Sequence, residues 1–410
     1  MLRRTALLAS LIPSIAFAGP GDAPVIGGMN APAGKWPDVA AILYDGNTNP
    51  FMTFECSGVL VAPTVVLTAG HCDPHVDNIG ALTGVLLGTT SLDNAAAGEI
   101  ISVSNTNIGQ YPASQSSIDI SIIKLPTAAK EAPRPIAVGW ARLDIQNGAK
   151  VEFVGYGATD KNANTYIPDL QQAESTITDF NCSTSSGCNA AAKPNGELGA
   201  GGMGIDTCPG DSGGPMYLVT DYGTFLAGIT SRSYDNAQFA CSEGGIYGRP
   251  DKIADYIEMV TGVKVARAPE PTADPITATR GDAGETQITA NDPKADDHTF
   301  AITTPPAHGT AKVRGDGRVR VCTDPAMAGT DSVVVTVTDS GNGARAVPMT
   351  IPITIADGNA PASCNIDDFS VAEAGGCCDA GRNPAGSLPL ALGVLVVLRR
   401  RRHRNAAVVR

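Results

Sequence analysis

The sequence predicts an all-β protein in which one short helix closes a first region and a smaller β module follows. From Val25 to about Val265, short β-rich runs such as "GVLVAPTVVLTAG" and "VEFVGYG" alternate with glycine turns. Within this region, "MYLVTDYGTFLAGIT" has the pattern of a hairpin with its turn near Asp221-Tyr222-Gly223. Short strands at such spacing are typical of a β-barrel or a β-sandwich.

The closing helix is predicted at the end of the first region. Asp251 can cap its start, and Gly262 can end it. Between them the apolar residues recur at helical spacing, namely Ile253, Tyr256, Ile257 and Val260.

A second β region is predicted after a linker. "ARAPEPTADP" at residues 266–275 contains three prolines, which keep a chain extended. Residues 276–357 then alternate as strands do. Their segments "PPAHGT" and "GTDSVVVTVTD" resemble bacterial Ig-like or cadherin-like modules of surface proteins. This resemblance implies a small β-sandwich.

The N-terminus is predicted to be an export signal. "MLRRTALLASLIPSIAFAGP" places two arginines before an apolar run that ends in Ala16-Phe17-Ala18. This order favours a secretory signal over residues 1–18, cleaved after Ala18, over the alternative of a buried strand. Export permits disulfides, so the ten cysteines are expected to form bridges rather than to stay reduced. They contain no CxxC pair, and zinc is not expected.

The C-terminus carries a stalk and an unusual tail. Residues 358–387 are rich in Gly, Ala and Cys, and an apolar run from Leu388 to Leu398 precedes an arginine cluster within residues 388–410. Eleven residues are few for a membrane-spanning helix, which needs about 17–25. The tail resembles C-terminal sorting tails of Gram-negative surface proteins. That resemblance implies a tail-processing sorting machinery and retention at the outer cell surface; the alternative is a tail that only anchors the chain.

The composition argues against nucleic acid as a partner. The chain carries 41 Asp and Glu residues against 29 Lys and Arg residues, for a formal net charge of −12. An acidic body of this kind repels phosphates.

Three stretches of the first region point to nucleophilic catalysis. "VVLTAGHC" places His71 at the end of an apolar strand, "SSIDISIIKL" sets Asp119 among isoleucines, and "DTCPGDSGGP" holds Ser212 between glycines. Singly, the histidine could be structural and the serine could belong to a glycine-rich turn. A carboxylate in an apolar run, however, needs a partner. Together, a serine, a histidine base and an orienting carboxylate make an activated hydroxyl nucleophile.

These motifs, in the order His, Asp, Ser and at separations of 48 and 93 residues, resemble the trypsin/chymotrypsin-like serine proteases. The resemblance covers residues 25 to about 262, within a protease domain expected over 25–265. It implies two packed six-stranded antiparallel β-barrels with the active site between them. His71 would be the general base, Asp119 its orienting carboxylate and Ser212 the nucleophile. The backbone N–H groups of Gly210 and Ser212 would bind the oxyanion.

A competing interpretation of the serine motif is excluded by the residues that follow it. "GDSGG" also fits the nucleophile elbow of α/β-hydrolases, which requires a helix after the serine and a later histidine. Here Pro215 and the β-like "MYLV" follow, and the later histidines fall in the second module or the tail.

The cysteines are assigned through the same resemblance. It implies bridges Cys56–Cys72 and Cys208–Cys241, and it leaves Cys182 and Cys188 to each other. Outside the protease region Cys322 can pair with Cys364, and one of Cys377 and Cys378 is a candidate sorting or lipidation site.

The resemblance also implies activation by cleavage. "VIGG" at residues 25–28 matches the family's activation sequence, so a cut after Pro24 would free the amine of Val25 to pair with Asp211. Residues 19–24 would then be a short propeptide. Family activators cut after Arg or Lys, whereas this site follows proline. A separate activating protease is therefore expected.

Substrate preference is predicted from the pocket positions of the family. Asp206, six residues before Ser212, would form the pocket floor and select Arg or Lys. Gly245, Ser231 and Ser233 would form its walls. Ser233 replaces a glycine, and Arg232 replaces an aromatic residue and could favour acidic flanking residues of the substrate. Because no carboxylate-rich loop occupies the family's calcium position, no metal or other cofactor is expected.

Three hypotheses follow. The first is a secreted or surface-displayed serine endopeptidase acting on proteins or peptides after Arg or Lys. The second is an active protease with chymotrypsin-like or narrow specificity, suggested by Arg232 and Ser233. The third is a non-catalytic surface-binding pseudoprotease, which the intact set of three catalytic residues disfavours.

Overall fold

The computed structural model describes residues 24–45, 49–110, 118–189, 196–294, 297–339, 345–359 and 363–370. The described residues up to Asp367 belong to one compact unit. The predicted signal peptide, most of the propeptide, the tail and Cys377–Cys378 lie outside the described residues. Within the described part, no helix has the length and apolar character needed to cross a membrane.

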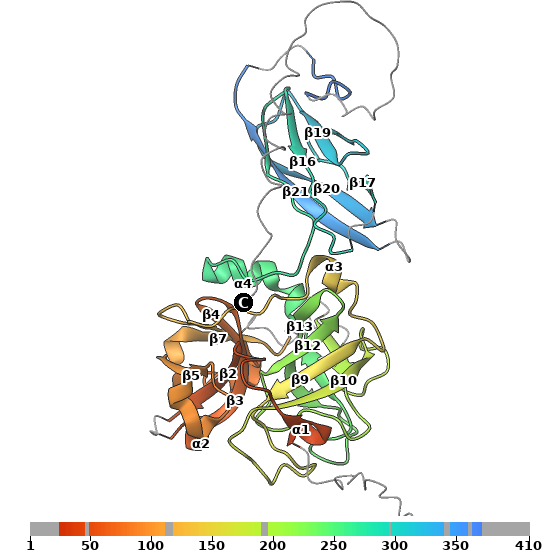
Figure 1. The fold of residues 1–410 in the computed structure, drawn as a ribbon. Helices are drawn as coiled ribbons and strands as arrows, with labels where there is room; N and C mark the ends of the chain where they lie inside the picture. The colour runs from red at the N-terminus through yellow and green to blue at the C-terminus, as the bar shows by residue number, and fades with distance from the viewer. Residues whose placement is uncertain are drawn as a thin grey trace, which may run out of the picture. The chain divides into compact units, whose positions relative to one another are not determined.

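The first sheet has seven antiparallel strands in the order β6-β5-β2-β3-β4-β8-β7 (Figure 1). Every side chain of β2 is buried, so this apolar strand is covered on both faces. The strands are β2 (Val39–Tyr44), β3 (Phe54–Ala62), β4 (Val65–Thr68), β5 (Leu82–Leu87), β6 (Glu99–Ser102), β7 (Ile108–Gln110) and β8 (Ser121–Lys124). Short helical turns connect them, namely α2 (Pro50–Thr53), η1 (Gly70–Cys72), η2 (Leu92–Ala97) and η3 (Asn105–Asn107).

The second sheet closes on itself. Its order is β1-β10-β11-β14-β13-β12-β9, and β9 also pairs with β10, so six strands form a ring, and β1 pairs with the first two residues of β10. The predicted hairpin is present as β12 and β13, with Thr220 opposite Gly223. The strands are β1 (Met29–Asn30), β9 (Lys150–Gly155), β10 (Gln171–Asp179), β11 (Glu197–Ala200), β12 (Pro215–Thr220), β13 (Gly223–Ser233) and β14 (Gly245–Gly248).

One hydrophobic core joins the two sheets. It includes Val59 and Leu67 from the first sheet and Phe153 and Met216 from the second, all fully buried. Each such side chain contributes about 1.5–3 kcal/mol of burial free energy. The sheets therefore hold fixed positions, and loops from both can build one site.

The closing helix starts later than predicted, and Asp251 does not cap it. The helix α4 spans Ala254–Thr261 and ends at Gly262, which is left-handed with φ of 72° as its predicted role requires. Asp251 lies in the preceding turn η4 (Pro250–Lys252), where its carboxylate accepts hydrogen bonds from Arg142 at 2.9 Å and Arg249 at 3.0 Å. Three charge-assisted bonds from two arginines to a buried carboxylate outweigh one exposed cap.

The predicted linker is not free along its whole length. Ala266 donates a backbone hydrogen bond to Val61 at 2.7 Å, and Ala268 donates one to Ile136 at 2.9 Å. Ala268 is buried among core residues of the first module. The proline-rich composition indicated an extended chain, but it could not show that the first half of the linker packs along the first β region.

The second module is a sandwich of two sheets. One has the order β15-β21-β20-β17, in which β15 runs parallel to β21, and the other has the order β16-β19-β18. Its core is formed mainly by Val and Ile residues. The strands are β15 (Ile276–Thr279), β16 (Ala283–Gln287), β17 (His298–Thr304), β18 (Gly309–Val313), β19 (Arg318–Thr323), β20 (Gly329–Asp339) and β21 (Ala346–Ala356). The predicted all-β fold class is confirmed.

Among the described residues, four disulfides are present. They join Cys56 to Cys72, Cys182 to Cys188, Cys208 to Cys241 and Cys322 to Cys364. All four pairings agree with the sequence-based assignment. The first holds the turn η1, which carries His71, against β3.

Candidate active site

The pairing of β4 with β8 brings His71 and Asp119 together. Thr68, the last residue of β4, lies opposite Ser121, the first residue of β8. His71 follows β4 within η1, and Asp119 lies two residues before the start of β8. The backbone N–H of His71 donates to Oδ1 of Asp119 at 2.8 Å, and Nδ1 of its ring lies 2.8 Å from Oδ2. This places the ring proton on Nδ1 and leaves Nε2 free to accept a proton.

A third donor completes the surroundings of the Asp119 carboxylate. The hydroxyl of Ser231 donates to Oδ2 at 2.7 Å. Burial raises the pKa of Asp119, but the hydrogen bonds from His71 and Ser231 and the charge of His71 outweigh burial and lower it. Burial lowers the pKa of His71, but the hydrogen bond and charge of Asp119 outweigh it, so the pKa is raised. The carboxylate is thus kept charged beside a more basic imidazole.

The turn that carries Ser212 is pressed against the end of β4. The backbone N–H of Ser57 in β3 donates to the carbonyl of Ser212 at 2.8 Å. A Cβ atom at Gly213 would lie only 2.2 Å from Oγ1 of Thr68, so only glycine permits this approach. The turn therefore lies beside the segment leading to His71. No hydrogen bond from the Ser212 hydroxyl to another described residue is present.

Backbone donors next to Ser212 are available to a ligand. Gly210 has a φ of 95°, and a Cβ there would lie 2.8 Å from Cα of Gly157. Its carbonyl accepts a hydrogen bond from the hydroxyl of Ser57 at 2.9 Å, which fixes the turn. Within the described residues, the N–H groups of Gly210 and Ser212 have no acceptor. Two such free donors can stabilise an oxyanion.

Asp206 is buried behind this turn and is 1% exposed. Its carboxylate accepts backbone hydrogen bonds from Thr207, Ser242 and Gly244, each at 2.9 Å. Burial raises the pKa of Asp206 to about 6, although these N–H bonds favour the charged form. A Cβ at Gly245 would lie 3.6 Å from Oδ1 of Asp206, so a side chain at this position would contact the carboxylate.

A cavity of about 210 Å³ adjoins Ser212. Ser231, Arg232 and Ser233 are among the residues that line it, and Asp206 is not. The hydroxyl of Ser233 donates to the carbonyl of Ala240 at 2.7 Å, which holds it in the cavity wall. Ser231 and Ser233 therefore line the cavity as the sequence predicted, whereas Gly245, the third predicted wall residue, and Asp206, the predicted floor, do not.

Arg232 is not the free cation that the sequence suggested. Its guanidinium forms two parallel hydrogen bonds with Glu197, at 2.9 and 3.0 Å. Sequence reasoning missed Glu197. The available signal was a carboxylate within the apolar strand β11, whose side chains are all buried. This pairing removes the basis for a preference for acidic flanking residues.

Val25 and Asp211 are both fully buried, but they are not paired in this uncut chain. The nitrogen of Val25 is part of a peptide bond, in the turn α1 (Pro24–Gly27). The carboxylate of Asp211 accepts backbone hydrogen bonds from Gly157 at 2.8 Å and Cys208 at 2.9 Å. Burial raises the pKa of Asp211 to about 7 against the effect of these bonds, and the charge of Asp206 adds to the rise.

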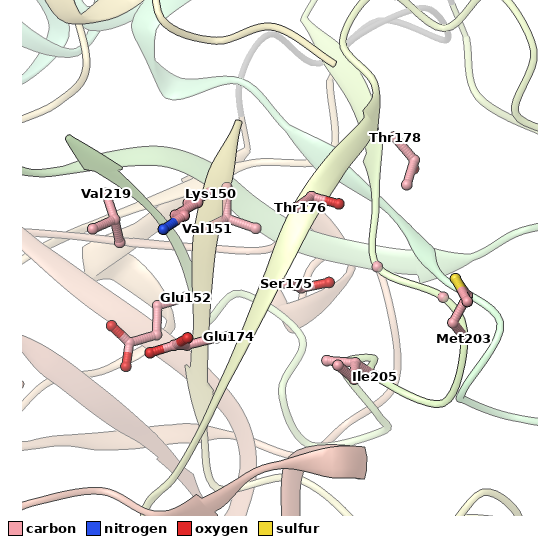
Figure 2. A pocket seen from close by; sticks show the side chains of 12 residues that line it. Lys150, Val151, Glu152, Glu174, Ser175, Thr176, Thr178, Met203, Ile205 and Val219 are labelled. Atoms are coloured by element: carbon pink, nitrogen blue, oxygen red, sulfur yellow. The ribbon is translucent and has the colours of Figure 1, made fainter. Parts of the chain in front are cut away.

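A larger groove lies on another part of the second sheet (Figure 2). It has a volume of about 520 Å³ and runs along β9 and β10. Glu152 and Glu174, which are opposite each other in these strands, lie at one end, and Met203 and Ile205 lie at the other. None of the predicted catalytic or pocket residues lines this groove.

Two groups of potential metal ligands occur among the described residues. They are Cys56, His71 and Cys72, and Cys182, Cys188 and Glu197. In both groups the cysteines form a disulfide, so their sulfur atoms are not available as thiolate ligands.

Comparisons with known proteins divide the chain in two. Residues 25–258 match the family model described as Trypsin, and residues 266–359 match the one described as Bacterial Ig domain. Brachyurin of Leptuca pugilator is 29% identical over 252 residues, which cover 58% of this chain and 99% of that protein. A trypsin-like protease of Streptomyces glaucescens is 30% identical over 256 residues, covering 62% and 87% respectively. The solved VesB protease of Vibrio cholerae aligns at 20% identity with a TM-score of 0.45, over 80% of this chain and 98% of that one.

Proposed function

Because the chain belongs to the trypsin family and is a trypsin-like serine endopeptidase followed by a bacterial Ig domain, we propose that Ser212, His71 and Asp119 are its catalytic triad. The observation that carries this proposal is the double hydrogen bond between His71 and Asp119, at 2.8 Å each, beside the turn of Ser212. It supports a ring held in one orientation and one tautomer.

The residues divide the reaction between them. His71 takes the proton of the Ser212 hydroxyl at Nε2 while the serine oxygen attacks the substrate carbonyl. The N–H groups of Gly210 and Ser212 stabilise the oxyanion of the tetrahedral intermediate. His71 then gives the proton to the leaving amine, and Asp119 stabilises the imidazolium throughout. Water then attacks the acyl group on Ser212 while His71 takes a proton from the water. His71 returns this proton to the serine oxygen as the carboxylic acid product leaves.

Asp206 is the proposed selector of Arg or Lys in the substrate. Its buried carboxylate lies beside Gly245, whose lack of a side chain supports access for a basic side chain once the pocket opens. A paired charge in a buried site discriminates strongly, because an uncharged substrate leaves the carboxylate without its partner. The other candidate is narrow or chymotrypsin-like specificity. The observation that favours it is that the cavity beside Ser212 does not include Asp206.

Activation by a cut after Pro24 offers a way to open the pocket to Asp206. In the uncut chain, the backbone N–H of Asp206 donates to the carbonyl of Ile26 at 3.3 Å. The backbone of Asp206 is thus hydrogen-bonded to the segment after Pro24, which a cut would free to move. We propose that a separate protease makes this cut and that the ammonium of Val25 then pairs with Asp211.

Export, retention at the outer cell surface and processing of the tail remain proposals that rest on the two chain ends. The domain limits, residues 25–265 for the protease domain and 276–357 for the Ig-like module, are likewise proposed from the sequence. Fractionation of cells expressing the full chain tests retention: activity in the outer-membrane fraction supports it, and activity only in the medium contradicts it.

The enzymatic proposal is tested on a chain whose residues 19–24 are replaced by a cleavage site that releases Val25. The cut chain is expected to hydrolyse a peptide library after Arg or Lys, and the cut Ser212→Ala chain is expected to be inactive. Activity that persists in Ser212→Ala would contradict the triad. Cuts mainly after aromatic residues would contradict only the role of Asp206.

A further inference from the structure

All four terminal N–H bonds of the Arg232 guanidinium are used. Nη1 donates to Oε1 of Glu197 at 2.9 Å and to the hydroxyl of Ser231 at 3.0 Å. Nη2 donates to Oε2 of Glu197 at 3.0 Å and to the carbonyl of Gly187 at 2.9 Å. Because a guanidinium is planar and its donors are fixed, four acceptors leave it a single orientation.

Glu197 is the anchor of this arrangement. Its side chain is 4% exposed, whereas that of Arg232 is 39% exposed. Oε2 of Glu197 also accepts the backbone N–H of Asn189 at 2.8 Å. A buried carboxylate is costly unless it is paired, so this is not an incidental surface ion pair.

The arrangement continues to the proposed catalytic histidine. Ser231 accepts from Arg232 and donates to Oδ2 of Asp119 at 2.7 Å. A hydroxyl has one proton. When a lone pair of its oxygen accepts a hydrogen bond, the proton points away from that donor and toward another acceptor. Arg232 therefore holds the Ser231 proton toward the same oxygen of Asp119 that lies 2.8 Å from Nδ1 of His71.

We propose that Arg232, fixed by Glu197, is a positioning residue for the Asp119–His71 pair and acts on it through Ser231 and through its own charge. The proposal rests on the proposed triad. It differs from a subsite role, because the guanidinium donors are already committed to the protein.

The positive charge of Arg232 opposes protonation of His71. The charged groups that act on His71 come from three segments: Asp119 before β8, Asp77 after η1, and Arg232 in β13. The two carboxylates favour the protonated imidazole, and Arg232 opposes it. The turn of His71 also holds Asp73 and His75, which bond to each other at 2.7 Å. Removing Arg232 would therefore shift the acid limb of the pH profile to higher pH.

The test compares three variants of the activated chain. Arg232→Met removes the positive charge and all four hydrogen bonds. Arg232→Lys keeps the charge but cannot form the four hydrogen bonds at once. Arg142→Met is the matched control, because Arg142 is 40% exposed and bonds to buried Asp251 at 2.9 Å. The readouts are kcat and KM on a small ester, the pH profile of kcat/KM, and titration of His71 by NMR.

Arg232→Met is expected to lower kcat about tenfold with little change in KM, and to raise the acid limb and the His71 titration midpoint by about half a pH unit. Arg232→Lys is expected to restore the midpoint but only part of kcat. Arg142→Met is expected to change neither.

Two results would overturn the inference: a loss of kcat with an unmoved His71 midpoint, or a change confined to KM. If even the unmodified activated chain lacks Ser212-dependent activity, the proposed function fails instead. The NMR titration needs no turnover, so it still decides whether Arg232 acts on His71. A midpoint equal to that of Arg142→Met would then reject the inference.

Discussion

His71 and Asp119 are joined at two points, since the backbone N–H of His71 donates to one carboxylate oxygen and its ring Nδ1 faces the other, both at 2.8 Å. One aspartate thus fixes both the turn that carries the histidine and the tautomer of its ring. Any change to this carboxylate should affect catalysis much more than folding.

Asp119→Asn is expected to lower kcat by about 10⁴, because the amide favours the wrong tautomer of His71. The measurement is kcat of the activated chain on a small ester at neutral pH. Asp77→Asn is the control, since Asp77 acts on His71 only through its charge. A loss of less than about tenfold in Asp119→Asn would contradict the orienting role.

The uncut chain is expected to lose stability as pH rises from about 4, near the ordinary pKa of an aspartate, to about 7. Burial raises the pKa of Asp206 to about 6 and that of Asp211 to about 7. In this range the folded chain holds protons that the unfolded chain has released, so stability falls with rising pH. The total effect is on the order of a few kcal/mol.

Thermal unfolding of the Ser212→Ala chain, uncut and cut, measures this dependence. The cut form should show a weaker fall, because the ammonium of Val25 then favours charged Asp211. His71 contributes in the same direction to both forms, so their difference reports on Asp211. Equal slopes in the two forms would contradict the proposed activation.

Asp206→Ser is expected to reduce kcat/KM for substrates with Arg by about 10³ and to change kcat/KM for uncharged substrates far less. The reason is loss of the one buried carboxylate that a basic side chain would meet. Glu243→Gln, which alters a carboxylate in the neighbouring loop, is the control and should keep the preference. An unchanged preference in Asp206→Ser would assign selection to another residue.

Arg134→Met is expected to destabilise the protease module by about 3–5 kcal/mol. Arg134 forms two hydrogen bonds with the buried carboxylate of Asp38, at 2.5 and 3.0 Å, and Tyr217 donates to it as well. Removing the cation leaves that charge buried. The control Lys264→Met removes an exposed lysine from its pair with Glu258, which Arg267 still contacts, and should cost less than about 1 kcal/mol. Chemical denaturation compares the two, and equal losses would contradict the role of burial.

The parts of the site that were predictable from sequence lie in short motifs. His71, Asp119 and Ser212 carry distinctive neighbours, and each motif is local in the chain. The pairing of Arg232 with Glu197 was not predictable, because 35 residues separate them and only the sheet brings them together. The same holds for Asp251, whose partner Arg142 lies 109 residues away and outweighs the local capping signal.

The pocket was only partly predictable for a similar reason. The sequence shows that a carboxylate stands at position 206. The burial of this carboxylate and its bonds to Ser242 and Gly244 depend on the path of a loop that is distant in the sequence. The residue type therefore indicated a role, whereas access to it depends on the conformation of the chain.

Covalent labelling tests the triad most directly. The activated chain is treated with a fluorophosphonate, which reacts only with an activated serine, and the modified residue is identified by peptide mass spectrometry. Labelling of Ser212 that disappears in His71→Ala is the expected result. Absence of label on Ser212 in the activated chain, or equal labelling in His71→Ala, would contradict the triad.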